Sequence, residues 1–370
     1  MIALRPPLPS IHQMLGHPSN FVAGDMPPDS AVDAGSAPDL ANVTPPPPPA
    51  DMSPPVTNGF PPHTRCGWID DPVAEQSFVA NAAQFNAVHP KWFTLASDGV
   101  SATPVGNTDL PSIVQAAAAN HVRILPLIDA GDTTVLRNML ASPTLRAQHV
   151  ANLVKVVHDH GYAGLDIDYE HLWQASDRPG YSAFMQELST AFHANGYELS
   201  MALEPLGATD SGNNGYDYNV LAQACDTLHM MCYDFHWVGG DHLGPLAPAG
   251  WVDASFTLAE STGHKEKFML GLGNYAVGDN YWCTAKQAAA QCSAAPATTT
   301  NHMLTCPYGN YNAGRTLSCN SPNGMLWFED VASMEEKVQI AISHGARGVT
   351  YWTIGDELPG YFDMVKKYFR

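Results

Sequence analysis

The feature that most constrains the fold is an alternation that starts at Cys66 and continues to the C-terminus. Short apolar runs each follow a helix-like stretch, an order typical of parallel β/α architecture. Eight such runs are present: CGWID (66–70), AVHPKWFTL (87–95), VRILPLID (122–129), AGLDID (163–168), ELSMALE (198–204), TLHMMCYD (227–234), KFMLGLG (267–273) and GVTYWTI (348–354). This alternation predicts an α/β fold in which residues 63–370 form a (β/α)8 TIM barrel.

An open, doubly wound sheet uses the same alternation and is the structural alternative. Such a sheet usually carries a glycine-rich phosphate loop, and neither GxGxxG nor GxxxxGK[ST] follows any of the predicted strands. Three segments, 110–121, 182–196 and 333–345, show the apolar spacing of amphipathic helices. The last two end at Asn195-Gly196 and Gly345, residues that suit helix C-termini.

The N-terminal segment, residues 1–62, has a different composition. It holds 16 of the 30 prolines, including PPPPP at 45–49, and only eight valine, isoleucine or aromatic residues. Such a segment buries too little apolar surface to offset its conformational entropy, so it is predicted to be a disordered or polyproline II linker. Prolines also interrupt its first 20 residues, which therefore lack the continuous apolar stretch of a secretory signal. The route of export stays open.

A second interruption, about residues 275–325, separates the seventh and eighth predicted strands. This Asn-, Thr- and Ala-rich stretch predicts an insertion into the barrel, beside the active-site face. It contains four of the seven cysteines, Cys283, Cys292, Cys306 and Cys319. We expect one or two disulfides there. Four free thiols are the first alternative. A zinc site is the second and is less favoured, because no CxxC pair occurs. Disulfides favour an extracellular or cell-envelope location.

The charge balance limits the kinds of partner. Seventeen basic residues against 36 acidic ones give a net charge of −19, whereas nucleic acids and anionic membranes require a positive surface. No apolar run approaches the roughly 18 residues of a transmembrane helix. A neutral or cationic substrate fits this composition. We also expect the protein to be a monomer.

The stretch GLDIDYEH, residues 164–171, places carboxylates at Asp166, Asp168 and Glu170. Alternate residues of a strand share one face and lie roughly 6.5–7 Å apart, so the three acids should climb one wall of the barrel toward its C-terminal mouth. Neighbouring negative charges raise each other's pKa, which helps one acid to keep a proton near neutral pH. Glu170, the outermost, is then the candidate proton donor, and Asp166 would hold Asp168 in position.

Two other interpretations of the acidic row remain open. Acids at alternate positions can bind Mg²⁺ or Ca²⁺, and acids of an edge strand or loop can simply face solvent. We expect no cofactor and no metal, because the 16 histidines are scattered without an HExxH motif or paired spacing.

Three motifs give the chain a family resemblance. AGLDIDYE closely resembles the DGxDxDxE signature of glycoside hydrolase family 18, the chitinases and their relatives, with Ala163 in place of the first Asp. MMCYDFHW resembles the family's MxYD motif, which maps onto Met231, Tyr233 and Asp234. VTYWTIGDE resembles the family's final strand, whose Trp, here Trp352, forms the floor of a sugar subsite.

The resemblance spans roughly residues 66–370 and implies retaining, substrate-assisted hydrolysis of β-1,4 links beside N-acetylglucosamine. Glu170 would protonate the glycosidic oxygen while the substrate's own acetamido carbonyl attacks the anomeric carbon. Asp168 would orient the acetamido N–H, Tyr233 would bind the acetamido oxygen, and Asp234 would hold the distorted sugar. Trp237, which follows the MxYD-like motif, could line another subsite.

The substrate stays open between chitin or chitooligosaccharides and peptidoglycan. AVHPKWFTLASDGV and GVTYWTIGDELPGYF look similar to the branch with spore-germination and cortex-lytic peptidoglycan hydrolases, and also to some chitinases. A non-catalytic sugar-binding protein is the alternative from another class. Weaker candidates near the barrel mouth are the acids that follow other predicted strands: Asp70, Asp71, Asp129 and Glu204.

Overall fold

The computed structural model describes residues 64–206, 214–240, 243–278, 281–292, 298–299, 303–306, 309–322 and 324–369. Of residues 298–299, 303–306 and 309–310 only the backbone is described. The predicted proline-rich linker, 1–62, lies outside these ranges.

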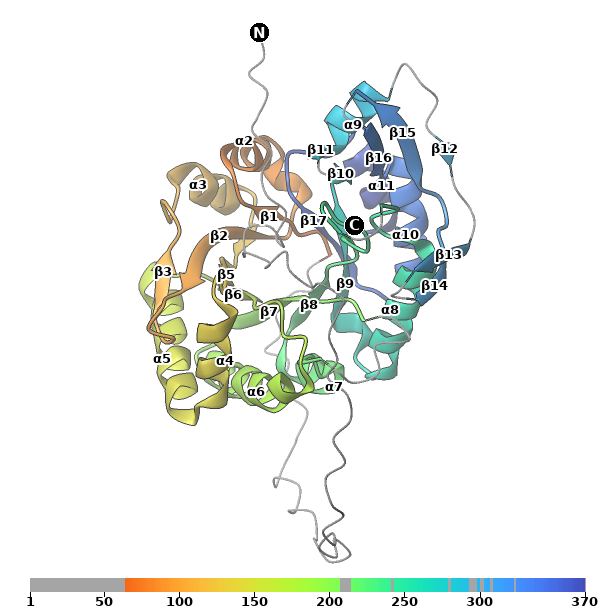
Figure 1. Ribbon diagram of the computed structural model, residues 1–370. Helices are drawn as coiled ribbons and strands as arrows, with labels where there is room; N and C mark the ends of the chain where they lie inside the picture. The colour runs from red at the N-terminus through yellow and green to blue at the C-terminus, as the bar shows by residue number, and fades with distance from the viewer. Residues whose placement is uncertain are drawn as a thin grey trace, which may run out of the picture.

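A parallel barrel forms the centre of the molecule (Figure 1). Its main strands follow one another around the sheet in chain order: β1 (Trp68–Ile69), β2 (Ala87–Leu95), β5 (Leu127–Asp129), β6 (Gly164–Asp168), β7 (Glu198–Leu203), β8 (Thr227–Met230), β9 (Phe268–Gly273) and β17 (Gly348–Trp352). A parallel bridge between Arg65 and Val349 closes the ring, with the Cys66 N–H donating to the Val349 carbonyl at 2.9 Å. The predicted (β/α)8 barrel is confirmed.

Each strand lies within its predicted apolar run, with two local differences. The third run divides into β4 (Arg123–Ile124) and β5, and Pro126, which has no N–H to donate, lies between them. β8 ends at Met230, four residues before the end of the predicted run. The Cys232 N–H donates to the Met230 carbonyl and the Tyr233 N–H to the Met231 carbonyl, so local bonds replace the ladder there. A short strand, β3 (Ala102–Pro104), pairs antiparallel with β2.

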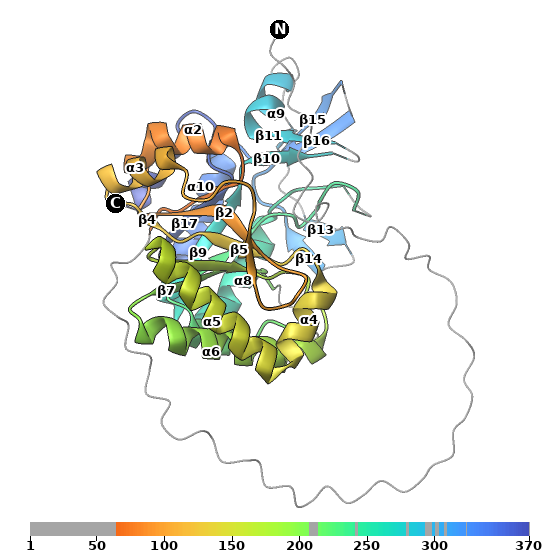
Figure 2. The same cartoon turned by 90° about the vertical axis from the view of Figure 1, so that its left-hand side faces the viewer.

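Helices surround the strands, and Figure 2 shows α4, α5 and α6 covering one side of the sheet. Their bounds are α2 (Pro72–Asn81), α3 (Pro111–Ala119), α4 (Thr133–Ala141), α5 (Pro143–His160), α6 (Arg178–Ala194), α7 (Tyr218–Ala224), α8 (Ala249–Ser261), α10 (Val331–Ser343) and α11 (Tyr361–Tyr368). Several begin at a sequence-encoded N-cap: Asp71, Asp132 and Asp217 each accept two backbone N–H groups of the following first turn. None of the described helices has the length and apolar content that a membrane crossing requires.

The segment between β9 and α10 forms two antiparallel sheets beside the barrel (Figure 1). One sheet contains β10 (Tyr275–Val277), β11 (Trp282–Thr284), β12 (Thr298–Thr299), β15 (Leu317–Ser321) and β16 (Gly324–Phe328), and the other pairs β13 (Met303–Cys306) with β14 (Gly309–Asn312). A short helix, α9 (Ala285–Gln291), follows β11. A disulfide joins Cys292 to Cys319, Cys283 is a buried free thiol, and the side chain of Cys306 lies outside the described residues.

Candidate active site

The acidic row starts within β6, a central strand of the barrel. β6 pairs with β5 on one side and β7 on the other, and all five of its residues are buried. The alternative that these acids face solvent on an edge strand or a loop is therefore wrong. Apolar Leu165 and Ile167 alternate with the acids, so the strand packs against the helices on one face and carries carboxylates on the other.

Asp166, the innermost acid, is completely buried and fully engaged. Its Oδ2 accepts a hydrogen bond from the Trp68 indole N–H at 2.8 Å, and its Oδ1 accepts one from the Ser200 hydroxyl at 2.7 Å. Ser200 is the direct partner of Asp166 in the β6–β7 ladder, so neighbouring strands fix this contact. Asp166 is thus a rigid anchor beneath the rest of the row.

Asp168 and Glu170 lie at the C-terminal end of β6, only 4% and 6% exposed. Burial raises the pKa of both carboxyl groups well above the ordinary range, and negative neighbours raise each pKa further. For Glu170 the largest such contribution to the raised pKa comes from Asp168 itself. Asp168 Oδ1 is buried without a hydrogen-bond partner among the described residues. The row can therefore hold a proton near neutral pH and offers an unsatisfied acceptor beside it.

Glu204 is the main partner of Glu170 that the motifs did not supply. It follows β7, the strand next to β6, and its carboxyl group shares a hydrogen bond with that of Glu170. Two carboxyl groups can hydrogen-bond only if one of them carries a proton. Burial raises the pKa of Glu204 to about 7, partly offset by this hydrogen bond. Its place at the end of the adjacent strand was the available signal, but sequence analysis ranked it only as a weaker candidate.

A lysine side chain, Lys91, partly compensates the negative charge of the acidic row. Lys91 of β2 forms an ion pair with Asp129 at the end of β5, with 2.8 Å between Nζ and Oδ2. Burial disfavours the charged lysine, but Asp129, together with Asp168 and Glu170, outweighs this effect and raises the lysine pKa. Lys91 in turn lowers the pKa values of Asp168 and Glu170. Lys91 carried no motif and was not predicted.

The segment after β8 brings Tyr233 and Asp234 to the site. Tyr233 is 5% exposed, and its hydroxyl has no hydrogen-bond partner among the described residues. Asp234 has a left-handed backbone (φ 59°) and accepts a hydrogen bond from the hydroxyl of Tyr275 in β10. Burial raises the pKa of Asp234 to about 6, although the Tyr275 hydrogen bond works against the shift. The insertion therefore contributes directly to the site through Tyr275.

The three remaining candidates for sugar binding, Trp352, Met231 and Trp237, differ in their burial and contacts. Trp352, the last residue of β17, is half-buried and meets Trp68 edge to face with 5.8 Å between ring centroids. Because Trp68 also bonds Asp166, this stack links Trp352 to the acidic row. Met231 is buried, and its N–H donates to the Leu203 carbonyl. Trp237 is half-buried farther along the same loop, where its carbonyl accepts from the Gly240 N–H.

This arrangement, a parallel β/α barrel with buried carboxyl groups of raised pKa at the carboxyl end of a strand, is typical of barrel enzymes that use acid–base chemistry. The comparison with known families is more specific. The model of glycosyl hydrolases family 18 matches residues 82–357, so the chain belongs to that family.

Two curated relatives are a glycosylase and a lytic enzyme of Bacillus species. The chain is 28% identical over 242 residues to the putative sporulation-specific glycosylase YdhD of Bacillus subtilis, covering 60% of this chain and 54% of that protein. It is 24% identical over 282 residues to the cortical fragment-lytic enzyme of Bacillus cereus, covering 72% and 64%. The chain thus spans less than two thirds of the length of these curated relatives.

Solved structures share the fold. A chitinase from Chromobacterium violaceum superposes with a TM-score of 0.72 at 22% identity, covering 82% of this chain and 98% of that one. The spore cortex-lytic enzyme SleL of Bacillus megaterium superposes with a TM-score of 0.70 at 19% identity, covering 83% and 74%.

Proposed function

We propose that this protein is a retaining glycosidase that cleaves β-1,4 links next to N-acetylglucosamine, in chitin or chitooligosaccharides, by substrate-assisted catalysis. The observation that carries the proposal is the group formed by Glu170, Asp168 and Tyr233. Glu170 shares a proton with Glu204, whereas Asp168 and Tyr233 present buried polar atoms that have no partner within the described part of the chain. Such atoms are uncommon in native proteins and require an explanation.

An acetamido group would satisfy both unpartnered atoms. Its N–H can donate to Asp168 Oδ1, and its carbonyl oxygen can accept from the Tyr233 hydroxyl. These contacts would hold the carbonyl oxygen beneath the anomeric carbon, where it acts as the nucleophile. A substrate that supplies its own nucleophile needs a single acid–base carboxyl group from the protein.

Glu170 fits that acid–base role. Its raised pKa keeps it protonated at the start of the reaction, when it donates to the glycosidic oxygen as the bond breaks. The acetamido carbonyl closes an oxazolinium ion, whose positive charge the Asp168 carboxylate stabilises. Glu170, now ionised, removes a proton from the water that opens the ring. Asp234 would bind the distorted sugar, and Trp352 offers a flat apolar face for a pyranose.

Peptidoglycan is the second candidate substrate, because it presents the same acetamido group. The similarity to a cortical fragment-lytic enzyme and to SleL favours it. Either glycan is an extracellular or cell-envelope polymer, so we propose that location and a monomeric enzyme. A non-catalytic sugar-binding protein is disfavoured by the protonated Glu170–Glu204 pair, which binding alone does not require.

The test is product analysis by mass spectrometry with two substrates, N-acetylglucosamine tetramer and purified peptidoglycan. Wild-type protein should cleave at least one of them. Glu170→Gln should lower kcat by about 10²-fold or more, because an amide cannot donate the proton. Glu266→Gln, at a 65% exposed glutamate outside the site, is the matched control and should retain full activity.

Binding measurements separate the remaining outcomes. Glu170→Gln should still bind the preferred glycan, since the amide preserves the shape of the site. If wild type bound the tetramer but cleaved neither substrate, the hydrolase proposal would fail and a sugar-binding role would replace it.

A further inference from the structure

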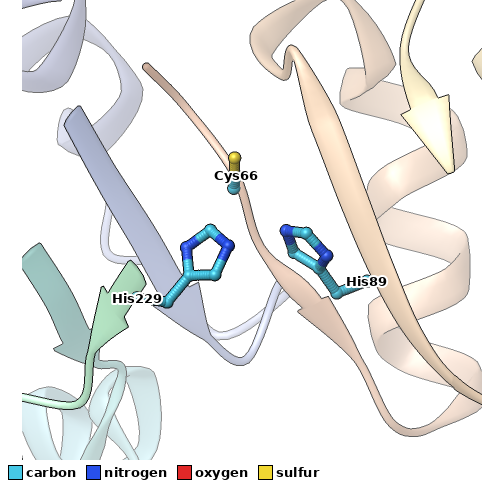
Figure 3. Close-up of side chains that lie close together, drawn as sticks. All are labelled: Cys66, His89 and His229. Atoms are coloured by element: carbon cyan, nitrogen blue, oxygen red, sulfur yellow. The ribbon is translucent and has the colours of Figure 1, made fainter. Parts of the chain in front are cut away.

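A second polar group lies inside the barrel beside Asp166. Among the described residues, Cys66, His89 and His229 are the one set of three or more cysteine, histidine or acidic side chains whose potential ligand atoms all lie within 4.8 Å of one another. Figure 3 shows the three side chains meeting from separate backbone segments. Cys66 precedes β1, His89 belongs to β2 and His229 to β8, and all three are completely buried.

The hydrogen bonding of His89 fixes which of its nitrogens is available. Nδ1 lies 3.0 Å from the Leu125 carbonyl oxygen, and a carbonyl can only accept, so Nδ1 carries the hydrogen. Nε2 therefore bears the lone pair, and it is buried without a hydrogen-bond partner in the part of the chain that the structure describes. Leaving such an acceptor unsatisfied costs free energy. Histidines that bind metals typically show this pattern, with the second nitrogen donating to a backbone carbonyl.

The second imidazole and the thiol complete the cluster. The His89 and His229 rings lie 4.6 Å apart between centroids, which is close enough for one nitrogen of each to reach a common ion. A thiolate and two imidazoles are ligands that zinc and similar divalent ions prefer, whereas Mg²⁺ and Ca²⁺ prefer oxygen.

The electrostatic surroundings suit a divalent cation. Burial lowers the pKa of His89, which keeps the ring neutral as coordination requires. Burial raises the pKa of the Cys66 thiol, and a bound metal ion reverses this by displacing the proton. Asp166 lies 4.0 Å from His89 Nδ1 and 3.8 Å from His229 Nε2. Together with the thiolate, this carboxylate would balance the two positive charges of the ion.

The charged groups farther out are mixed in sign. Arg347 and Arg123 favour the thiolate form of Cys66, whereas Glu198 opposes it. Arg123 is itself paired with Glu198, which limits its repulsion of a cation.

We propose that Cys66, His89 and His229 bind one zinc-like divalent ion inside the barrel. Asp166 lies close to both histidines and is a further candidate oxygen ligand, although its hydrogen bonds to Trp68 and Ser200 already occupy it. The ion has a structural role, because it joins the segment that closes the barrel at Cys66 to strands β2 and β8. The proposal is independent of the substrate. The three residues are widely separated in sequence, which is why no short ligand spacing revealed them.

The test uses the full-length chain without an affinity tag. Elemental analysis of the purified protein should find about one equivalent of a divalent transition metal. After removal of the metal with a chelator, Co²⁺ should give a thiolate-to-cobalt charge-transfer absorption, which reports a cysteine ligand directly. Zn²⁺ at hundredfold excess over its Kd should raise the unfolding temperature by roughly 5 °C.

Two variants and one control complete the design. Cys66→Ser should abolish the charge-transfer band, and His89→Gln should weaken metal binding by at least about tenfold. Cys225→Ser changes another completely buried cysteine that is not in the cluster and should leave both readouts unchanged. The wild-type Co²⁺ spectrum remains informative if Cys66→Ser fails to fold. Absence of the band in wild type, with Zn²⁺ bound only at weak surface sites, would overturn the proposal in favour of a metal-free core.

Discussion

At the scale of single residues, the behaviour of Glu170 depends on a neighbour from another strand. Glu204 is buried beside it and shares its hydrogen bond, so the two carboxyl groups hold one proton between them. Like charges this close raise each other's pKa. We therefore propose that Glu204 acts through Glu170, as a positioning residue that keeps the proposed proton donor protonated.

Glu204→Gln tests this dependence. The substitution removes a negative neighbour, so the pKa of Glu170 should fall. Because Glu170 must be protonated to act as the acid, the alkaline limb of the kcat profile should move to lower pH. The measurement is kcat against pH for wild type, Glu204→Gln and the exposed-site control Glu266→Gln. An alkaline limb at the same pH in all three proteins would show that Glu204 does not influence the donor.

The residues that sequence analysis found and missed differ in one respect. Asp166, Asp168 and Glu170 were predictable as a row, because one strand holds all three at alternate positions. The partners of the row, Glu204 and Lys91, come from other strands, and their contacts depend on the register between strands. No local spacing encodes that register. The same reason hid the cluster of Cys66, His89 and His229.

At the scale of elements, the close approach of β6 to β7 positions the acidic row. Gly164, the first residue of β6, pairs with Glu198, the first residue of β7. A Cβ atom at position 164 would lie 1.9 Å from the Glu198 carbonyl oxygen, a backbone atom that cannot move aside easily. A side chain here would force apart the two strands that carry Glu170 and Glu204.

Gly164→Ala should therefore destabilise the protein by about 3 kcal/mol or more, through steric overlap within the sheet. Gly106→Ala is a suitable comparison: its backbone is left-handed (φ 70°), but a Cβ there would meet nothing within 4 Å. That substitution should cost only the conformational strain, about 1–2 kcal/mol. Chemical denaturation of both variants measures the difference. Equal losses would contradict the close-approach argument.

The strands themselves were more predictable than their ends. Each apolar run contains a barrel strand because burial on both faces demands continuous apolar residues. The ends depend on single backbone groups: Pro126 interrupts the third run, and local bonds from Cys232 and Tyr233 shorten β8. The antiparallel sheets beside the barrel had no clear alternation, so their strands were not predicted.

At the scale of the whole molecule, burial of ionisable groups links stability to pH. Glu198 and Glu204 have pKa values raised from 4.5 to about 7, and that of Asp234 is raised from 3.8 to about 6, in each case chiefly by burial. The native state therefore binds more protons than the unfolded chain between these limits. Stability should rise as pH falls from 8 through 7 toward 6, by at most about 1.4 kcal/mol per pH unit for each group.

A buried histidine acts in the opposite direction. His149 donates from Nδ1 to the Val100 carbonyl and its Nε2 bonds the Tyr169 hydroxyl, and burial lowers the pKa of His149 from 6.5 to about 4. The unfolded chain binds the proton first, so this group removes stability as pH falls through 6.5 toward 4. His89, whose pKa burial also lowers, adds to the loss.

The two effects together predict an unfolding temperature that rises as pH falls from 8 toward 6.5 and then rises less steeply toward pH 5, because the histidines offset part of the gain from the three acids. Thermal unfolding of the chelator-treated protein across this range, at constant ionic strength, measures the profile without a contribution from bound metal. Glu198→Gln removes one titrating acid and should flatten the decline in unfolding temperature as pH rises from 5 to about 7. An unfolding temperature that kept rising to pH 8 would mean that these acids are ionised in the native state without cost, and burial would no longer explain the protonated pair at Glu170.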